Sequence, residues 1–147
     1  MKKVIFSTLA VLALSTSAAE VGVNVTQDKV TDRTGYNIVV GDKFGPVGLE
    51  AGFTHFAKGD NNQNRYGVTA SYDFLKTSFA SFGVRTSAAY LDNQTGSDGY
   101  AVTVGAGVSV PVTKSLSAVV AFDRQYGQKK VESFNGNMIS GGLKYSF

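Results

Sequence analysis

Six charged side chains are the residues of this sequence best suited to chemistry, such as ion pairing. Each lies in a segment where every second residue is apolar, and each belongs to the other set, among glycine, serine and threonine. A strand places alternate residues on opposite faces, so we expect all six on the inner face of a closed sheet. Three are acidic and three are basic: Glu50, Arg65, Asp73, Arg85, Asp123 and Lys144.

Charges in such an interior are expected to form pairs, because an isolated buried ion is very costly. One interpretation is a fixed set of ion pairs that fills the interior and holds the strand register. The other is a gate, in which Glu50, Arg85, Asp123 and Lys144 exchange partners and open a water path. The sequence leaves the choice of pairs open.

Other reactive residue types are few. The chain has no cysteine, which excludes disulfides and thiolate chemistry, and its one histidine is His55. His55 belongs to the same alternating set as Phe53, which predicts a position on the apolar face at the rim. Residues 60–64 begin like a calcium loop, but Arg65 replaces the required glycine and Ser71 the required glutamate. We therefore expect no metal and no cofactor.

Eight segments of alternating apolar residues position these side chains. We expect strands over 20–26, 35–41, 47–57, 65–74, 79–91, 100–112, 115–126 and 134–147. Long polar loops follow the odd-numbered strands, at 27–33, 58–64, 92–99 and 127–133. Short turns follow the even-numbered ones, at 42–46, 76–78 and 113–114. This alternation is typical of an all-β, eight-stranded antiparallel up-and-down transmembrane β-barrel, with both termini at the short-turn end.

Aromatic residues gather at the ends of these strands. Tyr36, Tyr66, Tyr90, Tyr100 and Tyr126 lie beside the long loops, and Phe74, Tyr145 and Phe147 lie beside the short turns. Two such groups match the aromatic girdles of membrane barrels. A soluble β-sandwich would need large apolar residues on the second face, and a lipocalin-like barrel would need a more apolar interior.

The first 19 residues have the pattern of a signal peptide. A basic start at Lys2 and Lys3 precedes an apolar run over 4–14 and small residues up to Ala19. We expect cleavage after Ala19 and a barrel domain over 20–147, exported through the Sec pathway. The formal net charge of +3 is partly due to this leader, and no basic run indicates nucleic-acid binding.

The last seven residues alternate in the same way. Leu143, Tyr145 and Phe147 form one set, opposite Gly142, Lys144 and Ser146. Behind a secretory leader, this ending resembles the C-terminal assembly signal of bacterial outer-membrane β-barrels. The resemblance implies a monomer of the Gram-negative outer membrane, folded by the barrel assembly machinery. The chain is similar to the opacity-protein, outer-membrane protein X and outer-membrane protein A transmembrane group.

Some eight-stranded barrels modify lipid A, so an enzymatic function was considered. The lipid A deacylase family uses a histidine and a serine two positions apart on one strand, but His55 is followed by Phe56 and Ala57. The palmitoyltransferase family begins with an amphipathic helix, whereas Glu20 opens a strand. Omptin proteases have ten longer strands and need more than one histidine. We therefore expect a non-enzyme.

The expected function is a structural or surface-interaction role, with the four long loops as the contact surface. Cations in or near these loops suit lipopolysaccharide phosphates or anionic host glycans, and ordinary solvated loop charge is the simpler interpretation. They are Lys29, Arg33, Lys58, Arg124, Lys129 and Lys130. The alternative function is a narrow, low-conductance pore gated by the inward charges.

Overall fold

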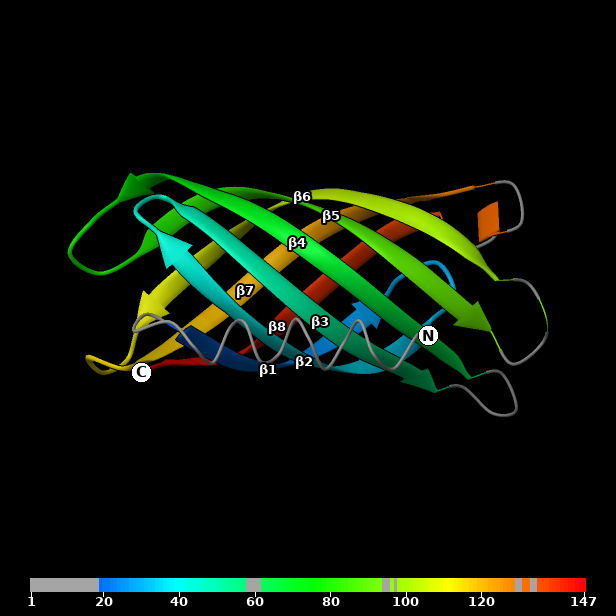
Figure 1. Ribbon diagram of the computed structural model, residues 1–147, viewed down its shortest axis with the longest axis horizontal. Helices are drawn as coiled ribbons and strands as arrows, with labels where there is room; N and C mark the ends of the chain where they lie inside the picture. The colour runs from blue at the N-terminus through cyan, green and yellow to red at the C-terminus, as the bar shows by residue number, and fades with distance from the viewer. Residues whose placement is uncertain (1–18, 58–61, 94–95, 97, 129–130, 133–134) are drawn as a thin grey trace.

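A computed structural model describes residues 19–57, 62–93, 96, 98–128, 131–132 and 135–147. Over these residues the chain forms a closed barrel in which every strand pairs antiparallel with its neighbours in sequence, and β1 pairs with β8 (Figure 1). This confirms the predicted fold class. The strands are β1 (Ala19–Asp28), β2 (Arg33–Phe44), β3 (Val47–Ala57), β4 (Gln63–Lys76), β5 (Ser81–Asn93), β6 (Gly99–Pro111), β7 (Leu116–Gly127) and β8 (Gly136–Ser146).

The outer wall of the barrel is apolar and exposed. Val23, Ile38, Val104, Val120 and Leu143 each leave about half of their surface uncovered, with values from 45% to 59%. An apolar surface that encircles the molecule is unfavourable in water and fits the hydrocarbon of a bilayer. Among the described residues, no helix has the length and apolar character needed to cross a membrane.

The two ends of the barrel differ. We call the end that carries the connections after β1, β3, β5 and β7 the loop end, and the other the turn end. The turn-end connections comprise residues 45–46, 77–80 and 112–115. Gly45 has a positive φ of 64°, which glycine adopts without steric cost, and so permits the two-residue turn. Thr77 closes the next turn, its hydroxyl oxygen accepting from Ala80 N at 3.0 Å.

The first connection at the loop end is shorter than predicted. The prediction of a loop over 27–33 is wrong in its bounds. β1 continues to Asp28 and β2 begins at Arg33, so the connection comprises residues 29–32. Gln27 pairs with Thr34 across the hairpin, and the Thr34 hydroxyl donates to the Gln27 side-chain oxygen at 2.7 Å. Asp28 then closes the turn by accepting from Val30 N at 2.9 Å. Polar residues therefore extend these strands instead of ending them.

Strand bounds at the turn end also differ from the prediction. Residues 42–44 belong to β2 rather than to a turn, and residues 79–80 belong to a turn rather than to β5. β4 continues to Lys76 through a bulge, where the register shifts between Asp73 and Leu75. The extra residue is Phe74, and both Phe74 and Leu75 are at least half exposed on the outer wall. A bulge reverses the face of every residue that follows it.

The remaining loop predictions are too long by a few residues. Residues 63–64, 92–93, 99 and 127 lie in strands, because they continue the hydrogen-bonded ladders. β8 begins at Gly136, two residues later than expected. The first 18 residues of the signal peptide predicted over 1–19 lie outside the described residues, and Ala19 is the first residue of β1. Residues 58–61 of the second loop and parts of the third and fourth loops also lie outside the described residues.

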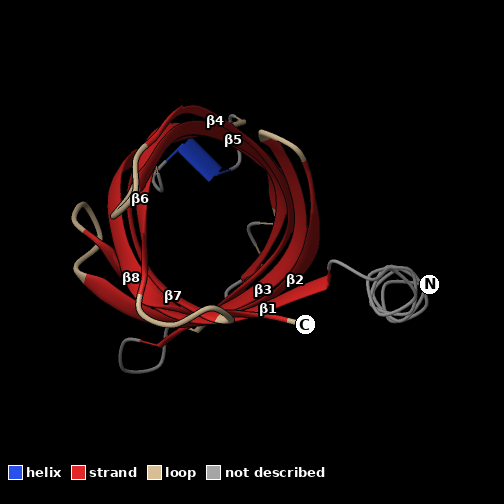
Figure 2. Ribbon diagram, turned by 90° about the vertical axis from the view of Figure 1, so that its left-hand side faces the viewer, coloured by secondary structure: helices blue, strands red, loops and turns tan. Residues whose placement is uncertain are grey.

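Residues of the last loop pack inside the barrel at the loop end. Val131 is fully buried against Leu91 and Ala101, which are also buried. Val131 N donates to Gln128 O at 2.7 Å, and Gln128 N donates to Tyr100 O at 3.0 Å. Figure 2 shows this short helical turn projected inside the ring of strands. This turn therefore packs on β5 and β6 inside the barrel at its loop end.

Candidate functional site

Two ion pairs cross the barrel interior at mid-height. Lys144 of β8 pairs with Glu50 of β3, although β1 and β2 lie between them in the ring. Arg85 Nε of β5 lies 3.2 Å from Asp123 Oδ1 of β7. Gly105 of β6 stands between these two residues in the register, and a Cβ there would overlap the Asp123 carboxylate. The absence of a side chain at Gly105 therefore makes the second pair possible.

A third ion pair lies nearer the turn end. Lys43 Nζ is 2.6 Å from Asp73 Oδ2, and the Lys43 side chain is 36% exposed. Asp73 is one of the six predicted inward charges, but its partner was not among them. Continuing the alternation of β2 by two residues would have indicated Lys43, which the sequence analysis assigned to a turn.

Arg65 differs from the other five predicted charges. Its guanidinium donates to Ser87 Oγ at 2.8 Å, to Thr103 Oγ1 at 3.5 Å and to Met138 Sδ at 3.6 Å. Among the described residues it has no carboxylate within ion-pair distance. The expectation that every inward charge is paired is therefore wrong for Arg65.

Two cavities occupy the interior. A central cavity of about 50 Å³ is lined by Arg65 and both mid-height ion pairs. A turn-end cavity of about 350 Å³ is lined by the Lys43–Asp73 pair, Glu20 and Lys76. Glu50, Lys144 and Arg85 line both cavities and so form the partition between them.

Glu20 and Lys76 were also missed as interior charges. Glu20 shares its alternating set with Gly22 and Asn24, so the alternation would have predicted its inward position. Lys76 follows the bulge at Phe74, and without that bulge it would face outward. A single-residue bulge has no reliable sequence signature.

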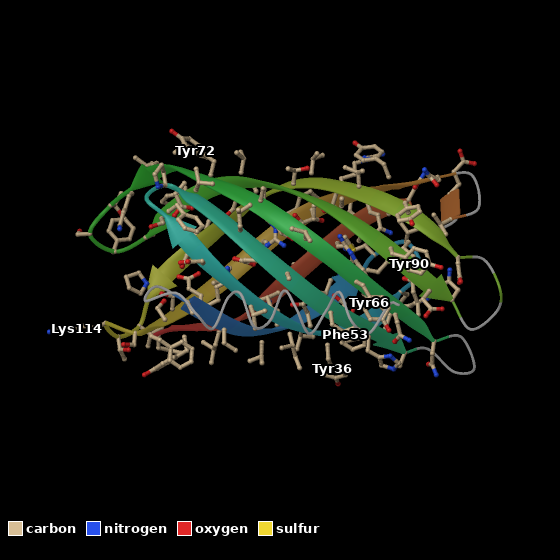
Figure 3. The ribbon with its side chains drawn as sticks, viewed as in Figure 1. Tyr36, Phe53, Tyr66, Tyr72, Tyr90 and Lys114 are labelled. Atoms are coloured by element: carbon tan, nitrogen blue, oxygen red, sulfur yellow. The ribbon has the colours of Figure 1, made fainter. Side chains whose placement is uncertain are left out.

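The predicted aromatic residues lie at the two ends of the outer wall. Tyr90 and Tyr100 pack edge to face with ring centroids 5.3 Å apart, and Phe53 packs on Tyr66 at 5.1 Å. Figure 3 shows Tyr36 pointing away from the barrel. The five predicted tyrosines lie within three positions of the loop-end termini of their strands: Tyr36, Tyr66, Tyr90, Tyr100 and Tyr126.

The turn end carries a second aromatic group. Tyr145 packs on Phe147 with ring centroids 5.1 Å apart. Phe74, two residues after Tyr72 in β4, is 60% exposed. Figure 3 shows Tyr72 pointing outward at this end. Leu143 belongs to the same outward set as Tyr145, so the predicted assembly signal lies on the lipid-facing wall.

One cation lies on the outer wall near the loop end. Arg124 of β7 belongs to the same outward set as Phe122 and Tyr126, and its guanidinium carbon lies 5.7 Å from the centre of the Tyr126 ring. Asn137 of β8 is its register partner. Among the described residues, Arg124 has no ion-pair partner. The predicted cations Lys58, Lys129 and Lys130 lie outside the described residues.

His55 lies on the outer wall, two residues before the loop-end terminus of β3 at Ala57. Its Nδ1 is 2.8 Å from Asn64 Oδ1. Within the described part of the chain, no three His, Asp or Glu side chains gather in a way that would hold a metal ion.

Comparison with known proteins places the fold. No family model matches the chain, and no curated protein matches its sequence. Solved structures do match: Ail of Yersinia pestis in a phospholipid nanodisc has 15% identity and a TM-score of 0.61, over 90% of this chain and all of that one. Neisserial surface protein A has 20% identity and a TM-score of 0.56, over 88% and 95%. The outer-membrane enzyme PagL has 15% identity and a TM-score of 0.52, over 87% and 98%.

Ail has also been solved with the heparin analogue sucrose octasulfate; this structure has 13% identity and a TM-score of 0.50, over 90% of this chain and all of that one. At these identities the likeness concerns the fold alone. The chain therefore has the fold of small outer-membrane barrels.

Proposed function

We propose that this protein is a monomeric Gram-negative outer-membrane barrel that contacts the phosphates of lipopolysaccharide at its loop end. A signal peptide over 1–19 and Sec export would deliver it, and the barrel assembly machinery would fold it through Leu143, Tyr145 and Phe147. The observation that carries the proposal is Arg124, a cation on the lipid-facing wall without an ion-pair partner among the described residues.

The position of Arg124 favours a phosphate partner. A cation facing lipid costs roughly 2–4 kcal/mol at the bilayer midplane but about 0–1 kcal/mol near the interface. Tyr126, on the same face, is of the residue type enriched at that interface. Guanidinium groups bind phosphate through two parallel hydrogen bonds, and the Asn137 amide offers a further donor next to Arg124.

The complex of Ail with an anionic sugar analogue supports this kind of ligand. It indicates that a barrel of this fold can bind a sulfated sugar. Lipid A combines phosphates with sugars in the outer leaflet, beside the wall where Arg124 lies. An adhesive contact with anionic host glycans through the same end is consistent with the same chemistry.

Binding of lipid A to the folded protein tests the proposal. Native mass spectrometry of the barrel in detergent would compare lipid A with its dephosphorylated form. A charge-assisted hydrogen bond contributes about 1.5–3 kcal/mol, so Arg124→Gln should weaken lipid A binding by about tenfold or more. Lys114→Gln is the matched control, because Lys114 lies at the turn end (Figure 3).

Two results would contradict the proposal. One is equal binding of lipid A and dephosphorylated lipid A by the unmodified protein. The other is an equal loss of binding in the Arg124 and Lys114 variants, which would indicate general attraction by positive charge.

We further propose that the protein is not an enzyme, although PagL shows that this fold accommodates one. His55 Nδ1 contacts the Asn64 amide oxygen, whereas a general base would contact a nucleophile. Incubation with lipid A followed by mass spectrometry should leave the lipid mass unchanged. A released acyl chain would refute this proposal.

A narrow pore is the second candidate, favoured by the two interior cavities that meet at Glu50, Lys144 and Arg85. Exchange of ion-pair partners there would join the cavities. Val131, buried against Leu91 and Ala101 inside the loop end, would narrow such a water path. Planar-bilayer recordings of the unmodified protein and of Lys144→Met decide the point: ion steps altered by the substitution support a gate, whereas a silent bilayer with folded protein indicates a plugged barrel.

A further inference from the structure

The central cavity carries a charge that the protein itself does not balance. Three cations line it, Arg65, Arg85 and Lys144, together with two carboxylates, Glu50 and Asp123. Lys144 is paired with Glu50, and Arg85 is paired with Asp123. One positive charge therefore remains, and it belongs to Arg65.

The groups that accept hydrogen bonds from Arg65 are polar but neutral. The carboxylate that attracts its charge, Asp123, is shared with Arg85, so one carboxylate faces two guanidinium groups. The Arg65 guanidinium donates to the hydroxyls of Ser87 and Thr103 and to the sulfur of Met138, which come from β5, β6 and β8. None of these groups carries a negative charge. An arginine does not lose its charge by releasing a proton, and a buried ion without a counter-ion is strongly unfavourable.

The hydroxyls beside Arg65 leave a donor directed at the cavity. Ser87 and Thr103 are hydrogen-bonded to each other, so one hydroxyl proton of the two is used in that bond. Ser87 lines the central cavity and Thr103 does not. When Thr103 donates to Ser87, the Ser87 proton is free to donate into the cavity, next to the guanidinium.

We propose that the central cavity binds one small monovalent anion of the halide class, chloride under physiological conditions, held by Arg65 and the Ser87 hydroxyl. The cavity volume of about 50 Å³ sets the size limit. About 10–15 Å³ of such space suffices for one water, so the cavity accepts one halide with a few waters and is small for a bulky organic anion. This site is separate from the Arg124 wall and does not depend on the lipopolysaccharide proposal.

The stability of the folded protein in different sodium salts tests the site. At constant ionic strength, replacing gluconate by chloride should raise the urea midpoint for unfolding of the detergent-folded barrel, with a shift that grows with chloride concentration. Arg65→Met should abolish this dependence on chloride. Lys43→Met is the matched control, because it removes an interior cation outside the central cavity and should keep the dependence.

A second measurement does not depend on the folding of a variant. Crystals of the unmodified protein grown in bromide should show an anomalous scattering peak in the central cavity, in contact with the Arg65 guanidinium. Identical urea midpoints in chloride and gluconate, or a cavity without a bromide peak, would overturn the proposal and indicate that water alone fills the space. A chloride dependence that survives in Arg65→Met would also overturn it.

Discussion

The ion pair between Glu50 and Lys144 should show a large energetic coupling. Their side chains are only 12% and 17% exposed, so each charge depends on the other. Removing one partner of a buried pair costs about 3–5 kcal/mol. We expect the low end of that range, because cavities large enough to hold water adjoin the pair and water there can solvate the remaining charge. Glu50→Gln and Lys144→Met should therefore each destabilise the barrel by about 3 kcal/mol.

The double variant should be much less affected than the two single variants suggest. With both charges gone no unpaired ion remains, and a well-packed neutral replacement is often close to neutral in stability. We expect the double variant to lie within about 1 kcal/mol of the unmodified protein. With about 3 kcal/mol for each single variant, this gives a coupling free energy of at least about 5 kcal/mol.

The pair between Lys43 and Asp73 provides an internal reference. It lies in the same interior, but the two side chains are 36% and 19% exposed. Solvent screens such a pair, so its coupling should not exceed about 1 kcal/mol. The comparison isolates burial, because both pairs join a lysine to a carboxylate across strands.

Reversible urea unfolding in lipid vesicles supplies the free energies. The chain has no tryptophan and seven tyrosines, so far-ultraviolet circular dichroism and tyrosine fluorescence would report the transition. Equal coupling for the two pairs, or coupling below about 0.5 kcal/mol for Glu50 and Lys144, would refute the argument from burial.

Three further predictions concern packing and assembly. Gly105→Ala should lower the free energy of unfolding by about 1–3 kcal/mol, because its Cβ would overlap a carboxylate of the next strand; Gly107→Ala, whose Cβ would be 3.4 Å from its nearest neighbour, is the control and should change the urea midpoint little. Val131→Ala should cost about 2 kcal/mol for two buried methyl groups and speed hydrogen exchange at the loop end; unchanged exchange would show that Val131 does not stabilise this end of the barrel. Phe147→Ser should severely reduce assembly in cells, measured as the yield of protein in the outer membrane. The same substitution should lower the free energy of urea unfolding of the purified barrel by no more than about 1.5 kcal/mol, the value of the ring contact with Tyr145.

Much of the architecture follows from alternation alone. A period of two assigns each residue to one face, so the six predicted charges all lie in the interior once the sheet closes. Alternation does not determine where a strand stops, since polar residues such as Gln27 and Asp28 remain paired in β1. The first loop is consequently as short as two of the turns at the other end.

The site was less predictable than the fold, for two physical reasons. Which charges pair depends on how strands meet around the ring, and the Arg85–Asp123 pair needs the empty position at Gly105. The bulge at Phe74 turns Lys76 to the inner face, and no local residue pattern predicts this bulge. The burial of Val131 depends on distant strands and not on its neighbours in sequence.

The seam between β1 and β8 has a consequence for how the chain reaches its folded state. All other strand pairs join sequence neighbours, whereas Glu20 and Ser146 at the seam are 126 positions apart. Hairpins form locally and quickly, but closing the ring brings the two ends together against the entropy of the whole chain. Until that step, two strand edges offer unpaired hydrogen-bonding groups to any other chain. The interval between synthesis and closure is thus when this protein is most prone to aggregate, and folding helpers have most effect if they shield the first and last strands.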